Sequence, residues 1–207
     1  MREKILIPGL VGASLLAAMT MAPLLASAVS SITSATIEPD KTGLEVNIGT
    51  ATPINTVGTD GAFGYGVLNA GDSIMVATTH SGVLDSELQI SDADPTWHNH
   101  YVMLNTDQGT VPAECAGNAA LGGARVEVAA LTFESPGEVK IDGASIKMED
   151  LPGVFAGTNA LTGAGQTFSP GTTADTAVLF TLNPLFDGDV LTNVCVENIT
   201  PFVAETD

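Results

Sequence analysis

The feature that most restricts the fold is a period-two alternation of apolar and polar residues. Leu44, Val46 and Ile48 alternate with Glu45 and Asn47, which is the pattern of a strand with one buried face. Short runs of this kind recur along the chain between segments rich in Gly, Pro, Asp and Thr, and none has the three-to-four spacing of an amphipathic helix. We therefore predict an all-β protein, a single antiparallel β-sandwich of jelly-roll or Ig-like type, whose strand order the sequence does not specify.

Two segments give the most specific structural predictions. Glu138–Met148 is predicted to form a hairpin, because Asp142-Gly143 supplies the residues of a tight primed turn between two alternating runs. Thr176–Leu182 is a continuous apolar run, typical of a strand that is covered on both faces. Asn183-Pro184 is expected to end that strand.

Two other segments carry weaker patterns. Leu84–Ile90 is a candidate strand with imperfect alternation. Gly157–Asp175 is rich in Gly, Thr and Ala and shows no periodicity, so it is expected to be a long loop. A loop of this length in a compact domain is usually functional or mobile.

The first 28 residues are organised like an export signal. Basic residues precede the apolar segment Ile5–Leu25, and Ala26-Ser27-Ala28 has the small-x-small form of a cleavage site. An uncleaved membrane anchor is the alternative, because the apolar run is long enough to span a bilayer. We expect residues 1–28 to be a signal peptide and 29–207 to be one secreted domain, extracellular or periplasmic, with no membrane contact after cleavage.

The chain is strongly acidic, with 24 acidic and six basic residues and a formal net charge of −18. Removal of the signal would leave 23 acidic and four basic residues. Such a charge repels nucleic acid and anionic membranes, so neither is expected as a partner. It either keeps the surface hydrated or provides a cation-binding surface.

Cys115 and Cys195 are the only cysteines. In an exported protein they are predicted to form a disulfide. They lack the close spacing of a cysteine zinc site. The loop that they would close spans about 80 residues, which corresponds to about 4–5 kcal/mol on the chain-entropy model.

All three histidines lie in one short window. His98 and His100 are two residues apart in the predicted strand Trp97–Leu104, so their rings project from the same face. His80 closes the preceding apolar run, Ser73–His80. Three imidazoles from neighbouring strands suit a transition metal, and we favour copper ahead of zinc.

Nearby acidic residues complete this metal hypothesis. Asp92, Asp94 or Asp85 could supply an oxygen ligand or orient a histidine. Asp92 and Asp94 also have the alternating spacing of a calcium loop, but Met103 stands at the twelfth position where an EF-hand needs Glu. Calcium is therefore less favoured than copper or zinc. The alternative is that all three histidines are incidental.

The opposite face of the same strand carries Trp97 and Tyr101. These rings either form an aromatic platform for a sugar or partner, or anchor the core.

The sequence contains no nucleophile elbow, phosphate-binding loop or dinucleotide fingerprint. We expect a secreted, non-catalytic binding protein that holds copper or zinc through its histidines. One alternative is a structural or adhesive surface protein without a metal, which would assemble through its strand edges. A second is a secreted hydrolase that uses carboxylates, although with this many acids some pair stands at glycosidase spacing by chance.

Overall fold

The computed structural model describes residues 29–41, 43–58, 60–69, 73–105, 115 and 126–206. The predicted signal peptide lies outside these residues. The described part of the chain is built of strands and irregular segments and contains no α-helix. No helix long and apolar enough to cross a membrane occurs within it.

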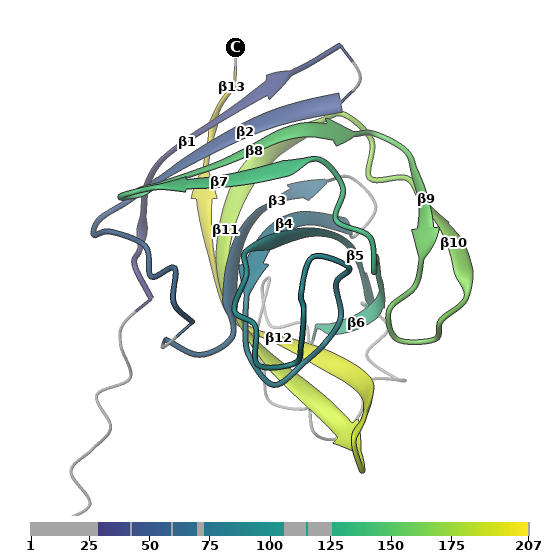
Figure 1. Cartoon of the computed structure of the whole chain (residues 1–207). Coiled ribbons are helices and arrows are strands. Elements are labelled where there is room, and N and C mark those ends of the chain that lie inside the picture. Colours follow the sequence, from purple (N-terminus) through teal and green to yellow (C-terminus); the bar gives the residue numbers. More distant parts are fainter. Residues whose placement is uncertain are drawn as a thin grey trace, which may run out of the picture.

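Six strands form an antiparallel sheet that closes on itself (Figure 1). We call it the closed sheet, and its strand order is β11-β12-β6-β5-β4-β3. Its strands are β3 (Phe63–Asn69), β4 (Ser73–Thr79), β5 (His98–Asn105), β6 (Glu127–Leu131), β11 (Ala174–Asp187) and β12 (Val190–Val203).

Five strands form a second, open sheet in the order β13-β1-β2-β8-β7. Its neighbours are antiparallel except for β13, which pairs in parallel with β1. These strands are β1 (Ile32–Pro39), β2 (Gly43–Thr50), β7 (Glu138–Asp142), β8 (Ser145–Pro152) and β13 (Glu205–Thr206). A separate hairpin consists of β9 (Phe155–Thr158) and β10 (Gly165–Phe168).

The open sheet packs across the outer face of the closed sheet (Figure 1). Their shared core joins Val46 and Ile48 of β2 and Met148 of β8 to Tyr65 of β3 and Tyr101 of β5. A second apolar cluster fills the inside of the closed sheet. The predicted all-β architecture of packed antiparallel sheets is confirmed, and the structure supplies the strand order that the sequence left open.

Two glycines on β3 let the closed sheet pack tightly. A Cβ added to Gly64 would lie 2.6 Å from the ring carbon Cζ of Phe180, and one added to Gly66 would lie 2.3 Å from the backbone oxygen of Met75. These separations are too short for any side chain. Glycine at both positions therefore allows β3 to approach its neighbours.

The predicted hairpin is confirmed, with its turn one residue later than expected. Asp142 pairs with Ser145, so the two turn residues are Gly143 and Ala144. Gly143 has a φ of 57°, which suits a primed turn with glycine at its first central position.

The predicted end of the strand at Asn183-Pro184 is wrong. β11 runs on to Asp187, and Pro184 pairs with Val194 of β12. The ladder between β11 and β3 extends only to the pair of Thr181 and Phe63. Beyond that point β12 is the one strand paired with β11 among the described residues. Pro184 has no N–H to donate, but on the side without a partner strand no ladder hydrogen bond is lost.

The expectation of one long loop over Gly157–Asp175 is also wrong in part. This segment contains the end of β9 and all of β10, and their hairpin encloses Gly163, which has a φ of 69°. The strands consist largely of Gly, Ala, Thr and Gln. The hairpin is held together by its backbone ladder. Its strands therefore do not need alternating apolar and polar side chains, and the sequence shows no strand pattern there.

The predicted disulfide between Cys115 and Cys195 is confirmed. Cys195 lies in β12 and is fully buried. The bond therefore ties a segment distant in sequence directly to the closed sheet.

Candidate metal centre

The structure brings the three histidines together inside the closed sheet. His98 pairs with Thr78 and His100 pairs with Val76 across the neighbouring strands β5 and β4. His80 follows directly after the end of β4. Alternation along both strands turns all three side chains to the inner face, where they are at most 2% exposed.

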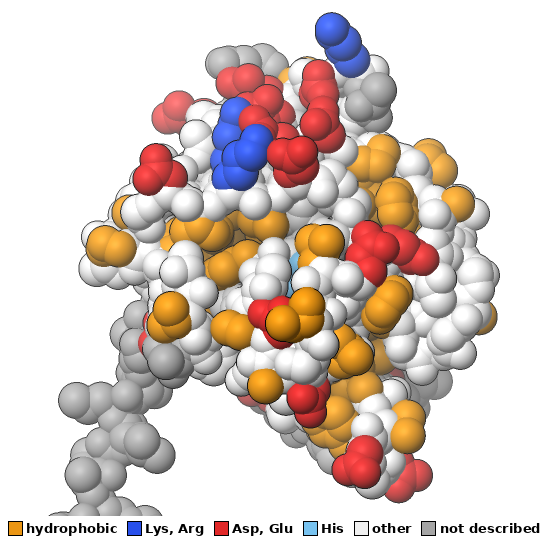
Figure 2. Space-filling model, viewed as in Figure 1, with side chains coloured by type: hydrophobic (Ala, Val, Ile, Leu, Met, Phe, Trp, Pro, Cys, Tyr) orange, Lys and Arg blue, Asp and Glu red, His pale blue; other side chains and the backbone are white. Residues whose placement is uncertain are grey.

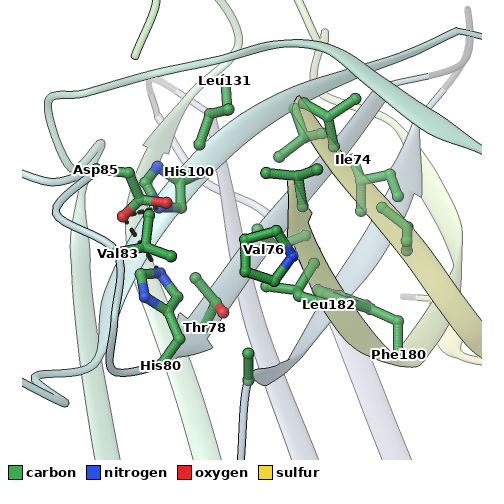
Figure 3. A pocket seen from close by; sticks show the side chains of 16 residues that line it. Ile74, Val76, Thr78, His80, Val83, Asp85, His100, Leu131, Phe180 and Leu182 are labelled. Carbon is green, nitrogen blue, oxygen red and sulfur yellow. Dashed lines mark ion pairs between the residues drawn. The ribbon is translucent and has the colours of Figure 1, made fainter. Parts of the chain in front are cut away.

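Asp85 completes the cluster from the segment between β4 and β5. Its Oδ1 lies 3.2 Å from Nε2 of His80, 3.4 Å from that of His98 and 3.6 Å from that of His100. Asp85 is 5% exposed. Figure 3 shows its carboxylate turned toward His80 and His100 at one end of an internal cavity. One ligand atom from each of the four residues lies within 4.8 Å of the others, as a single metal ion requires.

Gln89 shapes the segment that carries Asp85. Its side-chain oxygen accepts hydrogen bonds from the backbone N–H groups of Asp85 at 3.1 Å and Ser86 at 3.2 Å. Its amide nitrogen donates to the backbone oxygens of Val83 and Asp94. The predicted strand Leu84–Ile90 is therefore wrong, because one buried side chain satisfies backbone groups that a strand would pair with a neighbour.

Two backbone carbonyls fix the orientation of the histidine rings. Nδ1 of His98 lies 2.7 Å from the oxygen of Thr96, and Nδ1 of His100 lies 2.6 Å from the oxygen of Thr132. A carbonyl oxygen only accepts, so each Nδ1 must carry the proton. In the neutral imidazole, Nε2 then presents its lone pair, which is the usual arrangement of a metal-binding histidine.

Within the described part of the chain, the atoms that face the centre have no hydrogen-bond partner. Nε2 of all three histidines and Oδ1 of Asp85 are buried without one. For His98 and His100, the Nε2 lone pairs converge on a carboxylate oxygen that is also an acceptor. A cation between them would satisfy all these groups, whereas buried polar groups normally find a partner within the protein.

Burial and charge act in opposite directions on the cluster. Burial raises the pKa of Asp85, but the neighbouring imidazoles, His100 first, outweigh it and hold that pKa well below its usual value. Burial lowers the pKa of His98, against the attraction of Asp85. Both shifts favour the forms that bind metals, an ionised carboxylate and a neutral imidazole.

Asp92 and Asp94 are not brought into the cluster. Asp92 is exposed. The Asp94 carboxylate instead accepts hydrogen bonds from the backbone of Ile90 and from the backbone and hydroxyl of Thr96. Those bonds, the one from Ile90 first, lower the pKa of Asp94. The Asp94 carboxylate therefore binds the backbone of the same segment, and of the three acids only Asp85 contacts the histidines.

Sequence reasoning could include Asp85 only as one of three acids near the histidines. The carbonyls of Thr96 and Thr132 could not have been found at all, because a backbone group gives no signal in a sequence. Gln89 gave no distinct signal either, because Leu84–Ile90 also contains Asp85, Ser86 and Glu87.

Trp97 and Tyr101 anchor the core between the sheets. Trp97 is 8% exposed and Tyr101 is 1% exposed. The Trp97 ring meets Phe63 edge-on with centroids 5.5 Å apart. An exposed aromatic platform is therefore excluded for this pair.

Comparison with protein-family models, with curated proteins and with solved structures gives no match to this chain. The buried cluster of His80, His98, His100 and Asp85 is a group that could hold a metal ion.

Proposed function

We propose that this protein is an exported metal-binding protein that holds one zinc or copper ion in the closed sheet. The ligands are Nε2 of His80, His98 and His100 and Oδ1 of Asp85. The observation that carries the proposal is the convergence of three buried, unpartnered imidazole nitrogens on one buried carboxylate oxygen. Without a cation, the desolvation of these groups would be poorly compensated.

The distances favour tetrahedral coordination. Metal–ligand bonds of about 2.0–2.1 Å place the corners of a tetrahedron about 3.3 Å apart. The three separations between Asp85 Oδ1 and the histidine nitrogens, 3.2–3.6 Å, are close to that edge. A square-planar site would set one nitrogen about 4 Å from the oxygen, at twice the bond length. Zinc and copper(I) suit the tetrahedral arrangement.

The ligand set supports a binding role ahead of a hydrolytic one. Catalytic zinc sites have three protein ligands and keep a position for water, while closed sites have four. Here four side chains converge, and none is more than 5% exposed. Secretion is supported by the disulfide between Cys115 and Cys195, since disulfides persist in oxidising compartments.

The test is the metal content of the mature protein, residues 29–207, exported to an oxidising compartment and freed of loosely bound ions by dialysis. We expect about one zinc or copper per chain by elemental analysis. The double variant His98→Ala/His100→Ala should lose it. Cobalt(II) reconstitution should give the intense visible absorption of a tetrahedral site.

Asp85→Asn and Asp92→Asn form a matched pair for this experiment. Both remove one negative charge from the same segment, but only Asp85 faces the histidines. Asp85→Asn should weaken metal binding by more than the roughly 10–100-fold that loss of an outer-shell partner costs. Asp92→Asn should leave it unchanged. Equal effects would mean that the metal responds to overall charge, and absence of bound metal would leave the structural or adhesive function as the better hypothesis.

A further inference from the structure

An apolar chamber adjoins the metal ligands inside the closed sheet. Its volume is about 40 Å³. His80, Asp85 and His100 stand at one end (Figure 3). The remaining wall is almost wholly aliphatic and aromatic, and includes Ile74, Val76, Val102, Phe180, Leu182 and Val196.

Among the described residues, the wall away from the metal ligands offers no free polar side chain. Thr78 is the one other polar residue of this described lining, and its hydroxyl donates to the backbone oxygen of Phe63 at 2.9 Å. A molecule inside the chamber would therefore find a polar partner only at the metal end. Water is poorly suited to it, because a buried water needs two to four polar partners.

We propose that the chamber admits a small uncharged gas molecule, of the class of dioxygen, carbon monoxide or nitric oxide, to a copper(I) ion bound in the site. This inference rests on the proposed metal site. The volume suits a molecule of two or three heavy atoms, and the wall suits one without charge. An anion such as azide would lose its hydration and gain no hydrogen bond from the wall.

The metal can accept such a ligand in place of the Asp85 oxygen, because the three histidine nitrogens and the gas then complete a four-coordinate site. Asp85 is carried by an irregular segment rather than by a strand, so its carboxylate is the ligand that can most readily adjust. Figure 2 shows that only a small part of a histidine side chain is visible on this face, in keeping with the burial of His80 and His100.

The first arm of the test uses the mature protein loaded with copper(I), with carbon monoxide as the probe. Infrared spectroscopy should detect one bound carbon monoxide per copper. Azide, added to the copper(II) form at equal concentration, should leave the visible spectrum unchanged. Copper loaded without carbon monoxide binding, or azide binding as readily, would overturn the inference.

A matched pair of variants locates the gas. Val76→Phe fills the chamber, whereas Val190→Phe makes the same change at a position that is 65% exposed in β12. We expect Val76→Phe to keep its copper and to weaken carbon monoxide binding at least tenfold, while Val190→Phe binds as the parent does. Val196→Ile adds a single methylene to the wall and should weaken binding in the same direction if Val76→Phe does not fold. Unchanged binding in the folded chamber variants would overturn the inference.

Xenon separates this inference from the metal proposal. Xenon is uncharged, apolar and needs no metal. The metal-free protein should bind it in the chamber, as seen by xenon NMR, and Val76→Phe should not. Copper content with no xenon binding contradicts the chamber alone, whereas xenon binding with no copper contradicts the metal site and, with it, gas coordination.

Discussion

The two faces of β5 show how differently one strand can use its side chains. On the outer face, Tyr101 joins a dense core against the open sheet. On the inner face, His98 and His100 precede Val102 and Leu104, which line the second apolar cluster. Tyr101 and both histidines are buried, so burial alone does not distinguish core from site.

Hydrogen bonding does distinguish them. In the core between the sheets, the hydroxyls of Tyr65 and Tyr101 donate to the carbonyls of Ser30 and Pro152, and the Trp97 ring N–H donates to a carbonyl as well. Burial and the charge of Asp60 raise the pKa of Tyr65 to about 12, so it remains a neutral donor. Inside the closed sheet, Nε2 of the three histidines and Oδ1 of Asp85 have no hydrogen-bond partner among the described residues. The tyrosine hydroxyls and the Trp97 N–H of the core between the sheets are satisfied within the protein, while the inner cluster is a group that could hold a metal ion.

Of the changes to these two regions, loss of the disulfide should lower the free energy of unfolding most. Cys115 and Cys195 are 80 residues apart, so reduction should lower the free energy of unfolding by about 4–5 kcal/mol. Urea unfolding of the double variant Cys115→Ser/Cys195→Ser measures it. Because the bond reaches the closed sheet at β12, hydrogen exchange should rise more in β12 and β6 than in β2 and β8. An equal rise in hydrogen exchange in all four strands would contradict the prediction that the disulfide stabilises the closed sheet more than the open sheet.

Metal binding should stabilise the inner cluster almost as much. At a free metal concentration 1,000 times the dissociation constant, linkage predicts about 4 kcal/mol. For a domain of this size that corresponds to a rise in Tm of about 8–16 °C. Calorimetry with and without zinc checks this, and a rise of the same size in Asp85→Asn would show that the ion binds elsewhere.

A cavity in the core between the two sheets should lower stability without changing the metal content. Met148 of β8 is fully buried between the sheets. Met148→Ala should lower the free energy of unfolding by about 3 kcal/mol through lost contacts and a cavity. Metal content per folded chain should remain that of the parent. A loss of metal in the folded variant would mean that the two regions are coupled.

Removal of a charge from the exposed surface should have the smallest effect on stability. Glu149 accepts hydrogen bonds from Lys140 and Lys147, which, in that order, lower its pKa to about 2. A depressed carboxylate pKa stabilises the fold above the unfolded value of 4.5 and loses that contribution as the pH falls toward 2. Because the group is solvent-exposed, Glu149→Gln should change Tm only slightly at pH 7, and less in high salt. At pH 2 the difference in Tm between Glu149→Gln and the parent should vanish. A large difference in Tm at pH 7 would contradict the expectation that an exposed carboxylate matters less to stability than the buried Asp85.

Local pattern was enough to predict much of the fold. Alternation in Leu44–Ile48 and the turn residues near Gly143 specify strands and a hairpin from neighbours in sequence alone. The disulfide followed from there being only two cysteines in a chain expected to be exported. The turn at Gly143 was displaced by one residue because Asp142 pairs with Ser145 in the hairpin ladder.

The sequence by itself also determined that His98 and His100 share a face, because successive side chains of a strand alternate. Only the tertiary structure decided that His80 joins them, that Asp85 rather than Asp92 or Asp94 faces them, and that carbonyls of Thr96 and Thr132 hold the rings. These contacts depend on which strands become neighbours and on how Gln89 folds the intervening segment. Strand closure and side-chain-to-backbone bonding act between residues without a repeating spacing, so the linear pattern carries no record of them.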